Sequence, residues 1–97
     1  MGRFIYDSTL TVTLDDDLLS HLQAVIGAKF RLKQSFYFSW GYPANTGESR
    51  TMIWLTPSIS VQFHYRASRP PSLDRDRMAA LLAETNSPNG LVLIIGT

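Results

Sequence analysis

Alternating apolar and polar residues between positions 35 and 66 constrain the fold more than any other feature of this sequence. Three aromatic residues recur at every second position, namely Phe36, Phe38 and Trp40. The same spacing of apolar residues returns at positions 59–65. Because successive side chains of a strand point to opposite faces of a sheet, each segment has one apolar and one polar face. The pattern predicts a sheet with one face in the core and one polar face left for water or a partner, which carries Tyr37, Ser39, Gln62 and His64.

The rest of the chain supplies further strands and two helices. Strands are predicted over residues 3–6, 9–14, 35–40, 50–55, 59–65 and 91–95. Helices are predicted from residue 15 or 16 to about 32, and from 72 or 74 to about 84 or 85. The order β-β-α-β-β-β-α-β predicts an α+β fold, a two-layer sandwich in which two helices cover one face of a mainly antiparallel sheet. Because residues 91–95 are continuously apolar, we expect that strand to be central or covered on both faces.

The length and composition of the chain exclude several classes of protein. Ninety-seven residues are expected to form a single domain, residues 1–97. The chain has no cysteine, which excludes a disulfide framework, a thiolate metal site and a cysteine nucleophile, and fits a reducing compartment. We recognise no secretory signal, and no apolar run approaches the roughly 18 residues that a membrane span needs. We therefore expect a cytoplasmic protein that does not enter a membrane.

Carboxylates and histidines are too poorly arranged to predict metal or acid–base chemistry. Asp15, Asp16 and Asp17 stand in a row at the start of the first predicted helix. Such a run is typical of an N-cap that also compensates the helix dipole, whereas cation-binding loops space their ligands. The histidines, His21 and His64, are not brought together by any spacing, and we interpret them as packing or surface residues. The sequence therefore predicts no metal, no cofactor and no catalytic residue.

Basic residues are the main candidates for a binding surface. They are Lys29, Arg31, Lys33, Arg50, Arg66 and Arg69. If these side chains converge, they would contact phosphates; if not, they are separate solvated charges. The net charge of +1 is small for a dedicated nucleic-acid binder. Because Lys29 falls within the apolar stripe of its helix, either the helix has passed the edge of the sheet there or the lysine stem snorkels to water.

Trp54 and His64 complete the candidate site. Trp40 shares the parity of Phe36 and Phe38 and is expected in the core, whereas the alternation around Trp54 leaves its face undecided. An exposed Trp54 would offer a stacking platform for bases. We interpret the protein as a non-catalytic binding module whose basic rim contacts nucleic acid or an acidic protein partner. The alternatives are a self-associating protein, a homo-oligomer that uses the polar sheet face or an edge strand, and a small enzyme of unknown reaction.

Several segments resemble a family of short actinobacterial proteins of about this length. They are Tyr6-Asp7, D-D-x-L-L-S-H-L-Q-A-V-I-G-A-K-F-R, S-F-Y-F-S-W, R-T-M-I-W-L-T-P-S-I, R-P-P-S-L and A-E-T-N-S-P-N-G-L. The resemblance spans about residues 2–93 and implies no established function, although members often carry the label "ATP-dependent DNA ligase". Such ligases use a lysine nucleophile in a K-x-D-G setting. The lysines of this chain lie in K-F-R and K-Q-S, so the sequence contains no adenylation motif.

Overall fold

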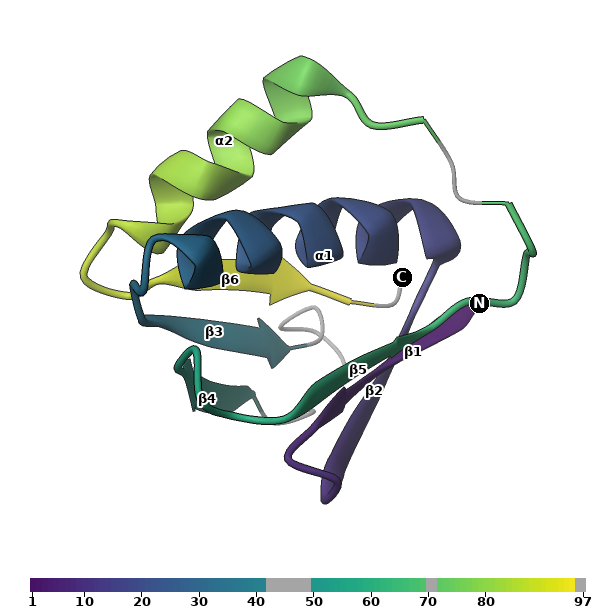
Figure 1. Cartoon of the computed structure of the whole chain (residues 1–97), viewed down its shortest axis with the longest axis horizontal. Coiled ribbons are helices and arrows are strands. Elements are labelled where there is room, and N and C mark those ends of the chain that lie inside the picture. Colours follow the sequence, from purple (N-terminus) through teal and green to yellow (C-terminus); the bar gives the residue numbers. More distant parts are fainter. Residues whose placement is uncertain (42–49, 70–71, 96–97) are drawn as a thin grey trace.

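The computed structural model describes residues 1–41, 50–69 and 72–95, and these ranges contain six strands and two helices (Figure 1). The elements are β1 (Gly2–Tyr6), β2 (Leu10–Leu14), α1 (Asp16–Arg31), β3 (Phe36–Gly41), β4 (Thr51–Leu55), β5 (Val61–His64), α2 (Arg75–Thr85) and β6 (Leu91–Ile94). Their order is the predicted one, and most strand pairs are antiparallel. The structure therefore confirms the predicted α+β fold. No helix within the described ranges is long and apolar enough to cross a bilayer.

The strands are divided between two three-stranded sheets rather than joined in one. Sheet A has the order β2-β1-β5, and sheet B has the order β4-β3-β6. Only the pairing of β3 with β6 is parallel. The two segments with the clearest alternation, β3 and β5, consequently belong to different sheets. Alternation identifies the two faces of one strand, but it does not say which strands pair.

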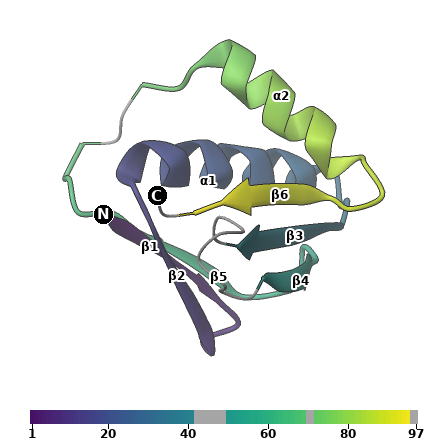
Figure 2. The same cartoon turned by 180° about the vertical axis from the view of Figure 1, so that it is seen from behind.

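The inner faces of both sheets meet α1 in one core. Phe4 of β1 is completely buried, and its ring packs edge-to-face on Phe38 of β3, with 5.8 Å between the ring centroids. The α1 side chains that face this core are Leu19, Leu22, Val25 and Ile26. Both helices lie on the same side of the strands, and Figure 2 shows from behind that α2 lies outside α1. Burial of each large apolar side chain stabilises such a core by about 1.5–3 kcal/mol.

The strand β6 lies at an edge of sheet B, which contradicts the expectation of a central or doubly covered strand. Leu91 and Leu93 point into the core and are buried. Val92 is half-buried, and Ile94 on the same side is 65% exposed. Among the described residues, the outer side of sheet B is largely apolar, which accounts for a continuous apolar run in an edge strand.

The three aspartates at the start of α1 make three different contacts. Asp15 is the N-cap and accepts the N–H of Leu18 at 2.7 Å, as predicted. The Asp16 carboxylate accepts the N–H of Ala67 at 2.9 Å, and this bond is the main cause that lowers the pKa of Asp16. Asp17 forms an ion pair with Arg77 of α2. The described residues contain no group of three or more carboxylates, histidines or cysteines placed to hold a metal ion.

His21 is a buried packing residue that links α1 to the start of α2. Its Nδ1 lies 2.7 Å from the carbonyl oxygen of Asp17, and its Nε2 accepts the N–H of Asp74 at 2.9 Å. Because Nε2 is an acceptor, the proton is on Nδ1 and the ring is neutral in this arrangement. The contacts explain why a histidine can be buried beside the core.

Candidate binding surface

The basic side chains do not converge on one rim. Arg31 and Lys33 lie at the C-terminal end of α1. Arg66 and Arg69 lie near its N-terminal end, since Asp16, the first residue of α1, accepts the N–H groups of Arg66 and Ala67. A helix of 16 residues is about 24 Å long, so these two pairs are far apart. The structure therefore favours separate solvated charges for these four residues.

Lys29 is buried and is not available to a partner. Its side chain is 6% exposed, and its Nζ donates a hydrogen bond to Oδ1 of Asn86 at 2.9 Å. Of the two alternatives for Lys29, the one in which its stem snorkels to water is therefore wrong. The ammonium contacts Asn86, the residue that follows α2, instead of water. It does so because the apolar stripe of α1 continues under the C-terminal end of α2. Lys29 links the two helices and does not belong to a binding surface.

His64 lies apart from the other candidates. It is exposed on the outer face of sheet A, where its Nε2 lies 2.8 Å from Oε1 of Gln62. Tyr37 and Ser39, which a single sheet would place on the same polar face, belong to sheet B. Ser39 is completely buried. The expected polar face shared by these four residues is therefore not formed, and His64 and Tyr37 do not share a site.

The outer face of sheet B brings two aromatic side chains together. Tyr37 of β3 and Trp54 of β4 are directly opposite in the strand register, and their ring centroids are 4.7 Å apart with planes at 61°. The two side chains are 44% and 47% exposed. Trp54 therefore faces solvent, whereas Trp40 is buried as predicted. About half of each ring is free to contact a ligand.

Further apolar residues lie on the same side of sheet B as this aromatic pair. Met52 precedes Trp54 on the same side of β4 and is 42% exposed, and β6 adds Val92 and Ile94 next to β3. We call this surface the sheet B outer face; it consists of Tyr37, Ser39, Gly41, Arg50, Met52, Trp54, Val92 and Ile94. Its members on the central strand β3, Ser39 and Gly41, are buried, whereas Tyr37, Met52, Trp54 and Ile94 are exposed. Large apolar side chains exposed together on one side of a small domain are typical of an interaction site.

Arg50 adds a positive charge to one end of the sheet B outer face. A Cβ atom on Gly41 would lie 3.2 Å from Cγ of Arg50, so the arginine stem covers the backbone of Gly41. Among its described members, this face has no carboxylate. Arg50 stands opposite Gly41 at one end of the face, four residues along β4 from Trp54, so the positive charge and the aromatic pair lie at opposite ends. This arrangement suits an extended anionic ligand with planar groups, because guanidinium binds phosphate or carboxylate and rings stack.

The sequence predicted Arg50 and Trp54 as site residues and placed Tyr37 and Ser39 on an outward face, but it did not indicate the other members or that these four residues share one face. A signal was present, because Tyr37 alternates with buried aromatic residues and Met52 shares the parity of Trp54. The pairing of β3 with β4 and β6 in a sheet of their own could not be known from these local patterns. That pairing turns scattered outward residues into one surface.

The fold and this surface define a small α+β domain with an exposed aromatic sheet face. The chain belongs to a family described as a domain of unknown function (DUF7882), whose model matches residues 1–95. No curated protein matches the chain, and no solved structure matches it.

Proposed function

We propose that this protein is a non-catalytic binding module whose sheet B outer face binds single-stranded nucleic acid. The observation that carries the proposal is the exposed Tyr37–Trp54 pair on the same face as Arg50. Bases stack on exposed aromatic rings with about 1–3 kcal/mol per base and little dependence on sequence. Arg50 lies four residues along β4 from Trp54, so it can contact a phosphate further along the same strand of nucleic acid rather than the one next to the stacked base.

The composition of the face favours single strands over a duplex or an acidic protein. Duplex DNA hides its base faces and presents phosphates, and one cation neutralises few of them. An acidic protein partner would likewise be held by charge, and among its described residues this face offers a single cation, Arg50. Unpaired bases match both the aromatic pair and the low charge of the face.

The proposal predicts that binding depends little on salt. Each phosphate contact with a single strand changes the slope of log K against log salt concentration by about 0.7. Arg50 is the one cation among the described residues of the sheet B outer face, so the expected slope is close to this value. A converging basic rim would give a much steeper slope.

The apolar members of the face support a second candidate function, self-association. Met52, Val92 and Ile94 add apolar surface that a nucleic acid needs only in part. Two copies that pack these faces together would form a homo-oligomer with a buried aromatic centre. This candidate replaces the polar sheet face that the sequence predicted with an apolar one.

Fluorescence anisotropy with a labelled oligothymidylate, an RNA single strand and a duplex of equal length tests the first candidate. We expect binding to both single strands, weaker binding to the duplex, and a loss of roughly 5- to 150-fold on Trp54→Ala, which corresponds to one stacked base. Arg69→Gln, which removes a cation far from this face, is the matched control and should bind normally. Unchanged binding by Trp54→Ala would refute the proposal.

Sedimentation velocity separates the two candidates on the same samples. If the sheet B outer face joins two copies, the protein sediments as a dimer without nucleic acid, and Trp54→Ala dissociates it. A monomer that binds oligothymidylate supports the first candidate. A dimer unaffected by nucleic acid supports the second.

The same proposal accounts for the ligase label of the actinobacterial proteins that the sequence resembles. A module that binds single strands would act on the same polymer as a DNA ligase without an adenylation lysine. We further propose that the protein is actinobacterial and cytoplasmic, and its lack of cysteine supports a reducing compartment.

A further inference from the structure

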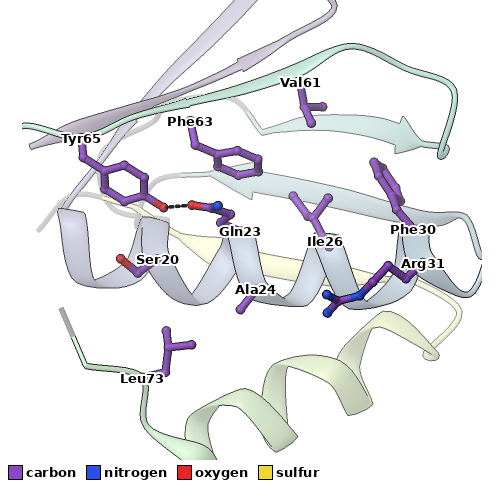
Figure 3. Close-up of a pocket in the computed structure, with 11 residues that line it drawn as sticks. Ser20, Gln23, Ala24, Ile26, Phe30, Arg31, Val61, Phe63, Tyr65 and Leu73 are labelled. Atoms are coloured by element: carbon purple, nitrogen blue, oxygen red, sulfur yellow. Dashed lines mark hydrogen bonds between the residues drawn. The ribbon is translucent and has the colours of Figure 1, made fainter. Parts of the chain in front are cut away.

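A groove with a volume of about 570 Å³ runs along α1 on the side that faces β5. In Figure 3, Val61, Phe63 and Tyr65 lie on one side of α1, and Leu73 lies on the other. The exposed surface of α1 between them forms the floor, which includes Gly27. The volume is within the roughly 300–1,000 Å³ of small-molecule sites. This groove is built from residues other than those of the sheet B outer face.

Gly27 keeps the floor of the groove open. Among the described residues, no atom lies within 4 Å of the position that a Cβ on Gly27 would occupy. No other described element therefore packs closely against the helix at Gly27. A glycine inside a helix costs about 1 kcal/mol relative to alanine, and packing does not explain this one. The space that its missing side chain leaves belongs to the groove.

The two ends of the groove differ in chemistry. At one end, the hydroxyl of Tyr65 donates a hydrogen bond to Gln23, and burial raises the pKa of Tyr65, so this end is polar and uncharged at neutral pH. The Ser20 hydroxyl beside it is enclosed; it lies near enough to Tyr65 to lower that pKa slightly, but it makes no hydrogen bond of normal geometry. At the other end is Arg31, the one charged residue among the described residues that line the groove. Arg31 forms no ion pair with any described carboxylate.

The middle of the groove is apolar. Ile26, Phe30, Val61 and Phe63 are among the residues that line it between Tyr65 and Arg31. From Ser20 to Arg31 the helix advances about 16 Å, at 1.5 Å per residue. An occupant that fits this shape has a long apolar body and one anionic end.

We propose that the groove between α1 and β5 binds a long-chain carboxylate, with the carboxylate at Arg31 and the alkyl chain over Gly27 toward Tyr65. Charge complementarity selects the acid over a cationic or neutral molecule of the same length. The apolar walls select a chain over a small anion. The inference is independent of nucleic-acid binding by the sheet B outer face.

Titration with dodecanoate, followed by ¹⁵N–¹H NMR below its micelle concentration, tests this proposal. We expect shifts at Gly27, Phe63 and Tyr65 and none at Trp54. Within a series from hexanoate to dodecanoate, affinity should rise by about fourfold for each methylene that the groove buries. Dodecyltrimethylammonium should bind less tightly than dodecanoate, and dodecanol should lie between them. Equal binding of all three head groups would overturn the assignment of the anionic end.

Two variants test the two halves of the site separately. Gly27→Leu fills the floor of the groove. It should weaken the binding of dodecanoate and of dodecanol alike by at least about tenfold, since several methylenes of either ligand can no longer be buried there. Arg31→Gln should weaken dodecanoate by roughly 2- to 5-fold, as expected for an exposed ion pair, and leave dodecanol unchanged. Ala80→Leu, on the exposed side of α2, and Arg69→Gln are the matched controls.

Thermal unfolding makes these results interpretable. Gly27→Leu replaces a helix-interior glycine with a good helix former, so its melting temperature should be equal to or higher than that of the wild type. Lost binding in a stable Gly27→Leu protein supports occupation of the groove. Normal dodecanoate binding by Gly27→Leu, or chemical shift changes confined to the sheet B outer face, would overturn the proposal.

Discussion

The outer faces of the two sheets differ sharply, although both come from short strands of one small domain. The outer face of sheet A is polar, and its exposed residues are Arg3, Thr11, Thr13, Gln62 and His64. The sheet B outer face carries Tyr37, Met52, Trp54 and Ile94, which are 42–65% exposed. The polar outer face of sheet A is what a sheet in contact with water requires. The sheet B outer face exposes apolar side chains instead, and this composition needs a reason other than folding.

The inner faces of the two sheets do not differ in this way. Phe4 and Phe63 of sheet A and Phe38 of sheet B lie in one aromatic group, with Phe4 between the other two. Both sheets therefore depend on the same core. The contrast lies outside, where the exposed apolar side chains of sheet B are typical of an interaction site and the polar side chains of sheet A are not. The four predictions below test how far this contrast extends.

Phe4→Ala should have the largest effect, because Phe4 is completely buried where the two sheets meet. We expect a loss of about 3–5 kcal/mol in the free energy of unfolding. Urea denaturation followed by tryptophan fluorescence, which reports on sheet B, and by far-UV circular dichroism should give one coincident transition. Ile5→Ala, next to it on the outer side of sheet A, should cost clearly less. Separate transitions for the two probes would mean that the sheets unfold independently.

Ser39→Ala tests the centre of the sheet B outer face. Ser39 is completely buried, and its hydroxyl has no hydrogen-bond partner among the described residues. Because an unpaired buried hydroxyl costs about 1–3 kcal/mol, its removal should raise the free energy of unfolding by about 1 kcal/mol. The control is Thr11→Ala on the exposed side of sheet A, where we expect a change within about 0.5 kcal/mol. A loss of stability in Ser39→Ala would show that the hydroxyl is bonded.

Trp54→Thr gives sheet B the residue type that sheet A uses on its outer side. The substitution removes the contact with Tyr37, which is worth about 0.5–1.5 kcal/mol for an aromatic pair, and half-exposure places the expected cost near the lower value. Binding of oligothymidylate should fall far more than stability does. His64→Thr on sheet A should leave both unchanged. Equal losses in stability and binding would remove the distinction between the two outer faces.

The inward and outward faces of each β-strand could be predicted from the sequence, because the alternation of apolar and polar residues is a local signal. Phe36, Phe38 and Trp40 are buried as their alternation indicates, and the predicted helices begin at their aspartate caps, Asp15 and Asp74. The division into two sheets depends on the pairing of β5 with β1, and these two strands are distant in sequence. No local pattern encodes that choice. For this reason the predicted polar face combined residues that belong to different sheets.

The candidate site was predictable to the same extent. Trp54 and Arg50 could be named from residue type and position, but their neighbour Tyr37 required the register of β3 with β4. Lys29 was misjudged because its partner, Asn86, is 57 residues further along the chain. A charge in an apolar stripe indicates an unusual contact, but only the tertiary structure says whether that contact is water, a ligand or another side chain.

The smallest effect should come from Asp16, which ties α1 to the chain that leaves sheet A. Hydrogen bonds from Ala67 and Arg66 hold the pKa of Asp16 below its ordinary value of 3.8. A carboxyl group with a lowered pKa in the folded state stabilises the protein above that ordinary value and loses this contribution as the pH falls through the lower one. Asp16→Asn should therefore flatten the acid side of the stability–pH curve, measured by urea denaturation between neutral and acidic pH. Asp7→Asn, in the exposed β1–β2 turn, is the matched control and should keep the wild-type slope. Because Asp16 is exposed and water screens its charge, the change should be small, and an unaltered slope in Asp16→Asn would mean that this tie does not hold sheet A to the helix in solution.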